Sequence, residues 1–159
     1  MSPERRARII AGRPQLQQQA REQYGLEINS GPVGANSRPA LVLEKYAETQ
    51  GKGAVFHVEA MRAYWEQARD IGDPAVLLEI ARQAGLNTKD FEQILTSEAF
   101  DEQVSADVEL AYEYGLTGVP ALVFADHYLV MGAQPYQVLK QVVERIIEEE
   151  KSGGEIERE

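Results

Sequence analysis

Residues 114–124 read YGLTGVPALVF and are the most informative stretch of the chain. Pro120 stands directly before a short apolar run, ALVFA at residues 121–125, that has the length and composition of a buried strand. A proline that opens a strand cannot donate a hydrogen bond to the ladder from its own nitrogen. The sequence therefore predicts a strand that begins at Pro120, with a loop directly before it.

A second apolar run, YLVM, follows at residues 128–131. Asp126 and His127 lie between the two runs and have turn character, so the segment is interpreted as a β-hairpin. Neither run alternates apolar with polar residues, so we expect both faces of the hairpin to be covered. Because two strands alone make a marginal sheet, other elements should complete it.

Helical patterns occupy most of the remaining sequence, with cap and stop signals at their ends. They are expected at about 2–25, 37–51, 53–68, 73–85, 87–95, 97–115 and 135–149. Pro14 should kink the first helix or split it in two, because its ring clashes with the carbonyl of Ile10. Ser37, Asp73 and Ser97 are expected caps, and Asn87 with Asp90 resembles a capping box. The last helix should turn six residues inward: Val138, Leu139, Val142, Val143, Ile146 and Ile147.

The composition and charge of the chain exclude several classes of function. The chain has 159 residues, 43% of them apolar, and a net charge of −10. It is long enough for one domain with a real core, and it has no basic run for nucleic acid. It has no apolar run long enough for a bilayer and no signal-like segment near Met1, so we expect a cytoplasmic protein without a membrane partner. The acidic residues near the end favour a disordered tail over 151–159.

The chain contains no cysteine, which excludes disulfides, thiolate metal sites and cysteine nucleophiles within it. His57 lies in a predicted helix without an accompanying nucleophile, and His127 lies in the hairpin turn, where histidine tolerates unusual backbone angles. Two histidines this far apart do not make a convincing metal site. No phosphate loop or dinucleotide fingerprint is present. We therefore predict no catalytic residue, no metal and no cofactor.

Three motifs resemble the DsbA family of thioredoxin-fold proteins. The stretch 114–124 is similar to the family's cis-proline loop and the strand after it, and VMGAQP at 130–135 is similar to the FrnE-like branch. AYW at 63–65 with DI at 70–71, followed by Leu77, Ala81 and GL at 85–86, resembles the family's helical insertion. Asn36-Ser37 with Ala40 fits that insertion more weakly. The order of these motifs makes the combination specific.

The resemblance implies an α/β chain that is mainly helical. It would be an incomplete thioredoxin-like fold, with a cis-proline loop, a β-hairpin and a C-terminal helix, that carries a large helical insertion. Residues 1–115 would form the helical region and residues 116–150 the C-terminal part of the thioredoxin-like fold. Residues 151–159 would form the acidic tail.

The resemblance also implies a binding site. In the family, the loop that corresponds to Thr117, Gly118, Val119 and Pro120 contains a cis peptide bond, here Val119–Pro120, and pairs with the backbone of a bound peptide or thiol substrate. Tyr64 and Trp65 are adjacent and point to different sides of their helix. At least one of them is expected in the core. The other is a candidate lining residue of a groove that faces the loop, although a core position is favoured for both.

Family members usually begin with a strand, a Cys-x-x-Cys at the start of a helix and a second strand, and Met1 corresponds to a position after these. Three explanations stay open: a fragment, a non-catalytic remnant that pairs with another chain, or chemistry by another residue. The leading hypothesis is a relative of thiol–disulfide oxidoreductases whose catalytic segment is absent, so that this chain alone is inactive. One alternative is a non-catalytic peptide-binding or assembly module. Another is a relative of glutathione-dependent isomerases and kappa-class transferases, against which the Gly-Ala-Gln-Pro sequence argues.

Self-association follows as an expectation. Without the missing strands, one edge of the 121–125 strand has unpaired backbone groups, and a face around Leu122, Phe124, Leu129 and Met131 loses its cover. Unpaired apolar edges recruit other strands, so we expect a homodimer through the hairpin edge. The alternative is a monomer in which the first helix folds over the gap.

Overall fold

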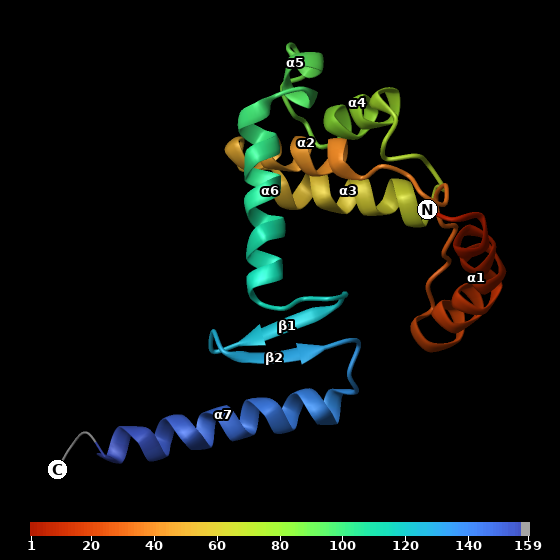
Figure 1. Ribbon diagram of the computed structural model, residues 1–159. Coiled ribbons are helices and arrows are strands. Elements are labelled where there is room, and N and C mark those ends of the chain that lie inside the picture. The colour runs from red at the N-terminus through yellow and green to blue at the C-terminus, as the bar shows by residue number, and fades with distance from the viewer. Residues whose placement is uncertain (157–159) are drawn as a thin grey trace. The chain divides into compact units, whose positions relative to one another are not determined.

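The computed structural model describes the fold of residues 1–156 and the side chains of residues 1–151 (Figure 1). Seven helices and two strands form in this part of the chain. They are α1 (Pro3–Tyr24), α2 (Arg38–Thr49), α3 (Gly53–Trp65), α4 (Pro74–Gln83), α5 (Phe91–Leu95), α6 (Glu98–Glu113), β1 (Ala121–Phe124), β2 (Tyr128–Met131) and α7 (Tyr136–Ile156). The predicted mainly helical chain with one hairpin is confirmed.

The chain divides into two compact units, residues 1–107 and residues 108–159. The division falls inside α6, earlier than the predicted change of region between residues 115 and 116. The predicted tail at 151–159 begins inside α7, which continues to Ile156, and residues 157–159 lie outside the described part of the chain. Over residues 1–156, no helix combines the length and the apolar character needed to cross a membrane.

Helix α1 remains one element through Pro14, so of the two expected outcomes, a kink or a division into two helices, the division is wrong. The Ser2 hydroxyl caps its start by accepting from the Arg5 amide at 3.2 Å. Gly25, with φ +67°, ends it in the left-handed region that glycine adopts without a steric penalty. The cap hydrogen bonds and the other backbone hydrogen bonds of the helix thus keep α1 continuous, although Pro14 has no amide hydrogen to donate.

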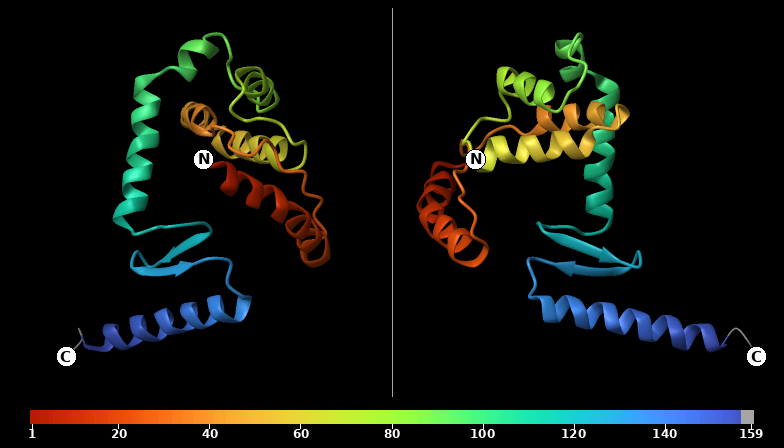
Figure 2. Two further views of the ribbon diagram at one scale, coloured as in Figure 1. Left: turned by 45° about the vertical axis from the view of Figure 1, so that its right-hand side comes forward. Right: turned by 180° about the vertical axis from the view of Figure 1, so that it is seen from behind.

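The core of the first unit is built from α2, α3, α4 and α5. Helices α2 and α3 lie side by side, and α4 packs against both (Figures 1 and 2). The buried core residues are Ala40, Leu43, Ala47, Phe56, Ala60, Ala63, Leu77, Ile80, Ala81, Ala84, Leu86, Phe91 and Ile94. Phe56, Leu43, Leu77 and Ile80 are the largest fully buried side chains. Their removal from water is the main favourable contribution to the stability of this unit.

The helix caps in this unit follow the sequence signals only in part. Asp73 caps α4 as predicted, because its carboxylate accepts from the Ala75 amide at 2.9 Å. Ser37 occupies the cap position of α2 but makes no side-chain cap hydrogen bond. The side-chain Oδ1 of Asn36 accepts from the Arg38 amide instead, at 3.1 Å.

The predicted capping box at α5 is wrong. Asn87 Oδ1 accepts from the amide of Lys89, two residues on, at 3.1 Å. Asp90 makes no side-chain cap hydrogen bond. An asparagine that forms such a local turn has used its acceptor before the helix begins.

Ion pairs join the beginning of α6 to α2. The Arg38 guanidinium donates to both carboxylate oxygens of Asp101, at 2.5 and 2.6 Å, and to the Ser105 hydroxyl at 2.8 Å. The Lys45 ammonium lies 2.7 Å from the Asp107 carboxylate. These contacts fix the part of α6 that belongs to the first unit.

The hairpin turn differs from the prediction in a way that changes the strand register. Three residues, 125–127, separate the strands, and Ala125 and Asp126 have φ values of +47° and +60°. The His127 amide donates to the Phe124 carbonyl at 3.2 Å and closes the turn. A type I′ turn requires two successive residues with positive φ. Ala125 and Asp126 adopt these values, whereas the predicted turn consisted of Asp126 and His127.

The register therefore pairs Leu122 with Val130 and Phe124 with Tyr128. Paired residues share a face of the sheet, so Leu122 and Phe124 lie on the opposite face from Leu129 and Met131. The predicted common face of these four residues is wrong, because a two-residue turn had been assumed. A shift of one residue moves every side chain of a strand to the other face.

The apolar side chains that are described in the second unit are at most half-buried. Leu139, Val142 and Ile146 of α7 are half-buried, whereas Val138, Val143 and Ile147 are exposed. Leu122, Val123 and Leu129 of the hairpin are exposed as well, so the expected cover on both strand faces is not present within residues 108–151. A sheet of two strands offers no neighbouring strand that could carry such cover.

Candidate functional site in the 117–120 loop

The loop before β1 starts at the end of α6. Gly115, with φ +67°, ends this helix, and its amide donates to the Tyr112 carbonyl at 2.9 Å. The Leu116 amide donates to the Ala111 carbonyl at 2.9 Å. This pair of hydrogen bonds satisfies two of the carbonyls that a helix end leaves free. The backbone is therefore fixed up to Leu116.

The loop itself is open to solvent. The Val119–Pro120 peptide bond is cis, and the Val119 side chain is 94% exposed. Within residues 1–156, Thr117, Gly118 and Val119 take part in no hydrogen bond. Unpaired amide and carbonyl groups at an exposed position are available to pair with another backbone. The loop contains no ionisable side chain, so its recognition would rest on backbone groups and apolar surface.

The far end of the loop is held by the residues after β2, a role the sequence analysis did not assign. The Gly132 amide donates to the Pro120 carbonyl at 2.8 Å. The Gln134 side-chain amide donates to the Met131 carbonyl, also at 2.8 Å. Both residues belong to the Gly-Ala-Gln-Pro sequence that carried the family resemblance. The sequence signal that could have indicated this role is a glycine and an amide side chain directly after a strand.

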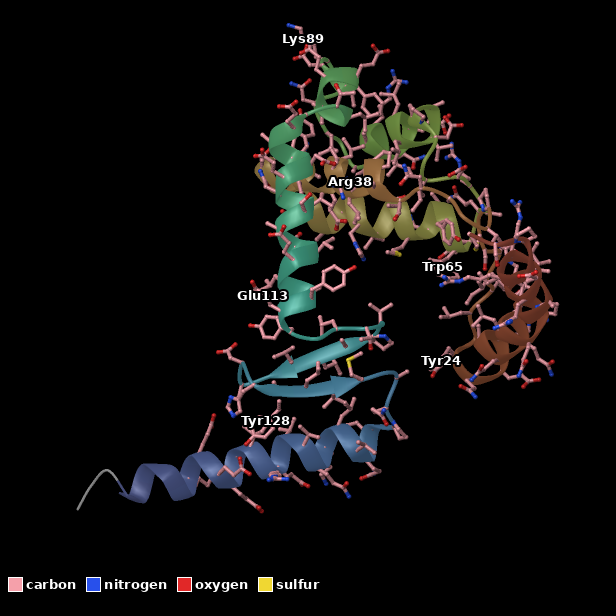
Figure 3. All side chains as sticks on the ribbon, viewed as in Figure 1. Tyr24, Arg38, Trp65, Lys89, Glu113 and Tyr128 are labelled. Atoms are coloured by element: carbon pink, nitrogen blue, oxygen red, sulfur yellow. The ribbon has the colours of Figure 1, made fainter. Side chains whose placement is uncertain are left out.

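Tyr64 and Trp65 lie at the end of α3 in the first unit, and neither is a core residue. Tyr64 is half-buried and Trp65 is 39% exposed, so the expectation of at least one core residue is wrong. Their rings meet edge to face with centroids 5.1 Å apart. Figure 3 shows Trp65 at the α3 end that lies near α1. The loop residues belong to the second unit, so these two sets of predicted site residues come from different units.

Both aromatic residues do line a surface groove within the first unit. This groove, of about 290 Å³, also includes Met61 and Ile71. A second groove, of about 350 Å³, lies between Trp65 and the apolar residues Leu16, Leu26 and Ile28. The Asn29 amide donates to the Trp65 carbonyl at 2.5 Å, and the Gly31 amide donates to the Tyr64 carbonyl at 2.7 Å. The 29–31 segment thereby satisfies carbonyls at the end of α3.

Shifted pKa values occur at surface ion pairs of the first unit. The Arg38 guanidinium, through its hydrogen bonds, holds the pKa of the Asp101 carboxyl below its usual value. Arg21 does the same for Glu27. A hydrogen bond to Asp107 raises the pKa of Lys45. Since these groups are engaged with each other, they indicate structural pairs and not an acid–base site.

The two histidines have structural surroundings. His57 Nδ1 lies 2.9 Å from a carboxylate oxygen of Glu44, and the two residues join α3 to α2. The His127 ring lies against Tyr128, with centroids 4.3 Å apart. Among the side chains that the structure describes, no three histidine or carboxylate groups come together as metal ligands.

Comparison with known proteins decides the family. The model of the DSBA-like thioredoxin domain matches residues 7–144. The chain belongs to the DsbA-like thioredoxin family. A probable DsbA oxidoreductase from Streptomyces coelicolor has a similar structure, with a TM-score of 0.72 and 28% sequence identity. That alignment covers 91% of this DsbA-like chain and 62% of the Streptomyces chain.

Two curated relatives also match the DsbA-like chain. The uncharacterised protein YwbO of Bacillus subtilis is 26% identical over 133 residues, which are 82% of this chain and 64% of YwbO. The ClpXP adapter protein SpxH of Halalkalibacterium halodurans is 27% identical over 124 residues, which are 73% of this chain and 40% of SpxH. The chain thus spans less than two thirds of the length of each of these relatives.

Proposed function

We propose that this chain is the polypeptide-binding part of a DsbA-like protein of the FrnE-like branch, and that residues 117–120 bind the backbone of a peptide substrate. The observation that carries the proposal is the open loop: Thr117, Gly118 and Val119 have exposed, unpaired backbone groups between two fixed ends. An extended peptide that lies along such a segment gains main-chain hydrogen bonds without a large rearrangement of the protein.

Thiol–disulfide exchange requires a thiolate as the attacking group. This chain has no cysteine, so in the proposed function the thiolate belongs to another polypeptide segment and this chain supplies only substrate binding. The Streptomyces relative, described as a probable DsbA oxidoreductase, supports a link to that chemistry. The Gly-Ala-Gln-Pro sequence favours the FrnE-like branch over glutathione-using isomerases and transferases.

A second candidate is a binding module that takes no part in thiol chemistry. The relative from Halalkalibacterium is described as an adapter protein, which is a binding role. The absence of cysteine is compatible with such a role, and the same open loop would bind a partner polypeptide in place of a redox substrate. Both candidates thus assign polypeptide binding to residues 117–120.

The test uses reduced, carboxymethylated insulin B chain, an unfolded polypeptide whose thiols are blocked. In a titration followed by nuclear magnetic resonance, we expect the amide signals of Thr117, Gly118 and Val119 to shift more than those of the first unit. Val119→Asp should weaken binding several-fold, because Val119 is 94% exposed and its replacement changes the loop surface with little effect on packing.

The matched control is Val58→Asp, at an exposed position of α3, and it should bind as the unchanged protein does. Signals of 117–119 that stay in place at saturating peptide would overturn the proposal. Equal weakening by the two substitutions would also overturn it, because the effect would then come from added negative charge alone.

A further inference from the structure

We propose that Gln134 is a positioning residue for the binding loop: its side-chain hydrogen bond to Met131 orients the Gly132 amide that holds Pro120. This inference rests on the proposed function of residues 117–120 for its consequence in binding. Its structural part concerns the free protein. Gln134 would act through Gly132 and would not contact the peptide.

The argument starts at Pro120. In an antiparallel ladder, two opposite residues exchange a pair of hydrogen bonds, but proline has no amide hydrogen to donate. At this step of the ladder, the bond from the Gly132 amide to the Pro120 carbonyl, at 2.8 Å, therefore has no reciprocal bond from Pro120. The position of the loop end depends on a single donor, where an ordinary ladder position would have two bonds.

The next step is the conformation of that donor. Gly132 has φ +77°, in the left-handed region, so the chain turns sharply as it leaves β2. A glycine has more conformational freedom than other residues, and it does not hold such a turn by itself. The Gly132 N–H shares a planar peptide unit with the Met131 carbonyl, so a contact to that carbonyl also orients the amide toward Pro120.

Gln134 makes that contact. Its Nε2 donates to the Met131 carbonyl at 2.8 Å, three residues back along the chain. The bond closes the segment 131–134 around Gly132, just before Pro135 and the start of α7 at Tyr136. A hydrogen-bond donor is needed here, because the Met131 carbonyl can only accept. The side chain thus fixes the turn from which the Gly132 amide reaches Pro120.

The variants separate the donor from the size of the side chain. Gln134→Glu keeps the shape but offers no donor when ionised, whereas Gln134→Lys restores a donor of similar reach. Gln137→Glu makes the same charge change at an exposed position of α7 and is the matched control. In the free protein, Gln134→Glu should speed hydrogen exchange of the Gly132 amide about fivefold or more and move the signals of Gly118 and Val119, in keeping with the loss of one hydrogen bond.

With the carboxymethylated insulin B chain, Gln134→Glu should weaken binding about five- to tenfold, with recovery in Gln134→Lys and no change in Gln137→Glu. Two outcomes would overturn the inference. One is an unchanged Gly132 exchange rate together with unmoved loop signals. The other is equally faster exchange of the β1 and β2 ladder amides, which would show a general structural role.

The proposed function can fail separately. If the unchanged protein does not bind the peptide at residues 117–119, the proposed function is wrong. The exchange rate of Gly132 and the signals of Gly118 and Val119 in the free protein then still decide whether Gln134 positions the loop.

Discussion

Replacement of Leu77 by alanine should strongly destabilise the first unit. Leu77 lies in α4, is fully buried, and belongs to the core cluster that joins α2 to α5. The substitution removes three carbon atoms, and at about 0.8 kcal/mol for each buried methylene this costs about 2.4 kcal/mol of transfer free energy. The cavity that remains raises the expected loss of unfolding free energy to about 3–5 kcal/mol.

The assay uses Trp65, which is the single tryptophan of the sequence and lies in the first unit. Its fluorescence during urea unfolding therefore follows the unit that contains Leu77. With a urea dependence of about 2 kcal/mol per molar, the midpoint should fall by about 1.5–2.5 M. That loss is a large fraction of the stability of a domain of this size, which is about 5–15 kcal/mol.

Two comparison variants sharpen the result. Leu77→Met keeps the volume of the side chain and should cost less than about 1.5 kcal/mol. Val58→Ala removes two carbons from a position of α3 that is 52% exposed, and it should change stability by less than about 0.5 kcal/mol. If Leu77→Ala shifts the midpoint no more than Val58→Ala does, the close-packed core described for this unit is wrong.

Three further predictions concern thiol chemistry, self-association and the pH dependence of stability. Purified protein should reduce insulin no faster than a blank without protein, because no cysteine is available as a thiolate; a rate above the blank contradicts this. Light scattering over a dilution series should show a homodimer that pairs through the free edge of β1; a constant monomer mass at high concentration rejects it. Because Arg38 lowers the pKa of Asp101, their pair stabilises the fold above the ordinary aspartate value of about 4 and loses this effect as pH falls through the lowered value. The urea midpoint of Asp101→Asn should therefore lie below that of the unchanged protein at pH 6, with a difference that shrinks in acid; a difference independent of pH contradicts the assignment.

Local signals predicted most of the helices because the interactions behind them are local. Asp73 caps α4, and Gly85 adopts the left-handed φ of +71° that lets the chain leave this helix. Pro14 shows the limit of such reasoning. A proline removes one donor from a helix, but whether the helix divides depends on the sum of the remaining bonds and caps.

The hairpin register could not be predicted from its two strands alone. Their apolar runs have no alternation, so nothing in them distinguishes one register from the next. The turn decides the register, and Ala125 adopts a positive φ there although alanine carries no turn signal. The conformation at Ala125 thus differs from the one its residue type favours. Consequently, Leu122 and Leu129 were predicted on one face of the sheet, although they lie on opposite faces.

In the candidate site as well, the sequence identified one part, whereas the role of the other part depends on hydrogen bonds formed in the fold. The 117–120 loop was located by its resemblance to a known family, whereas the role of Gly132 depends on a bond that crosses the hairpin to Pro120, and that of Gln134 on its bond to Met131 beside it. Over residues 108–151 no side chain is buried, so a close-packed core cannot hold the loop in place. Its position then depends on directional bonds: the α6 cap at Gly115 on one side and the Gly132 amide on the other. Because each such bond contributes only about 1 kcal/mol, the loss of a single donor should change the orientation of the loop measurably while the hairpin stays paired.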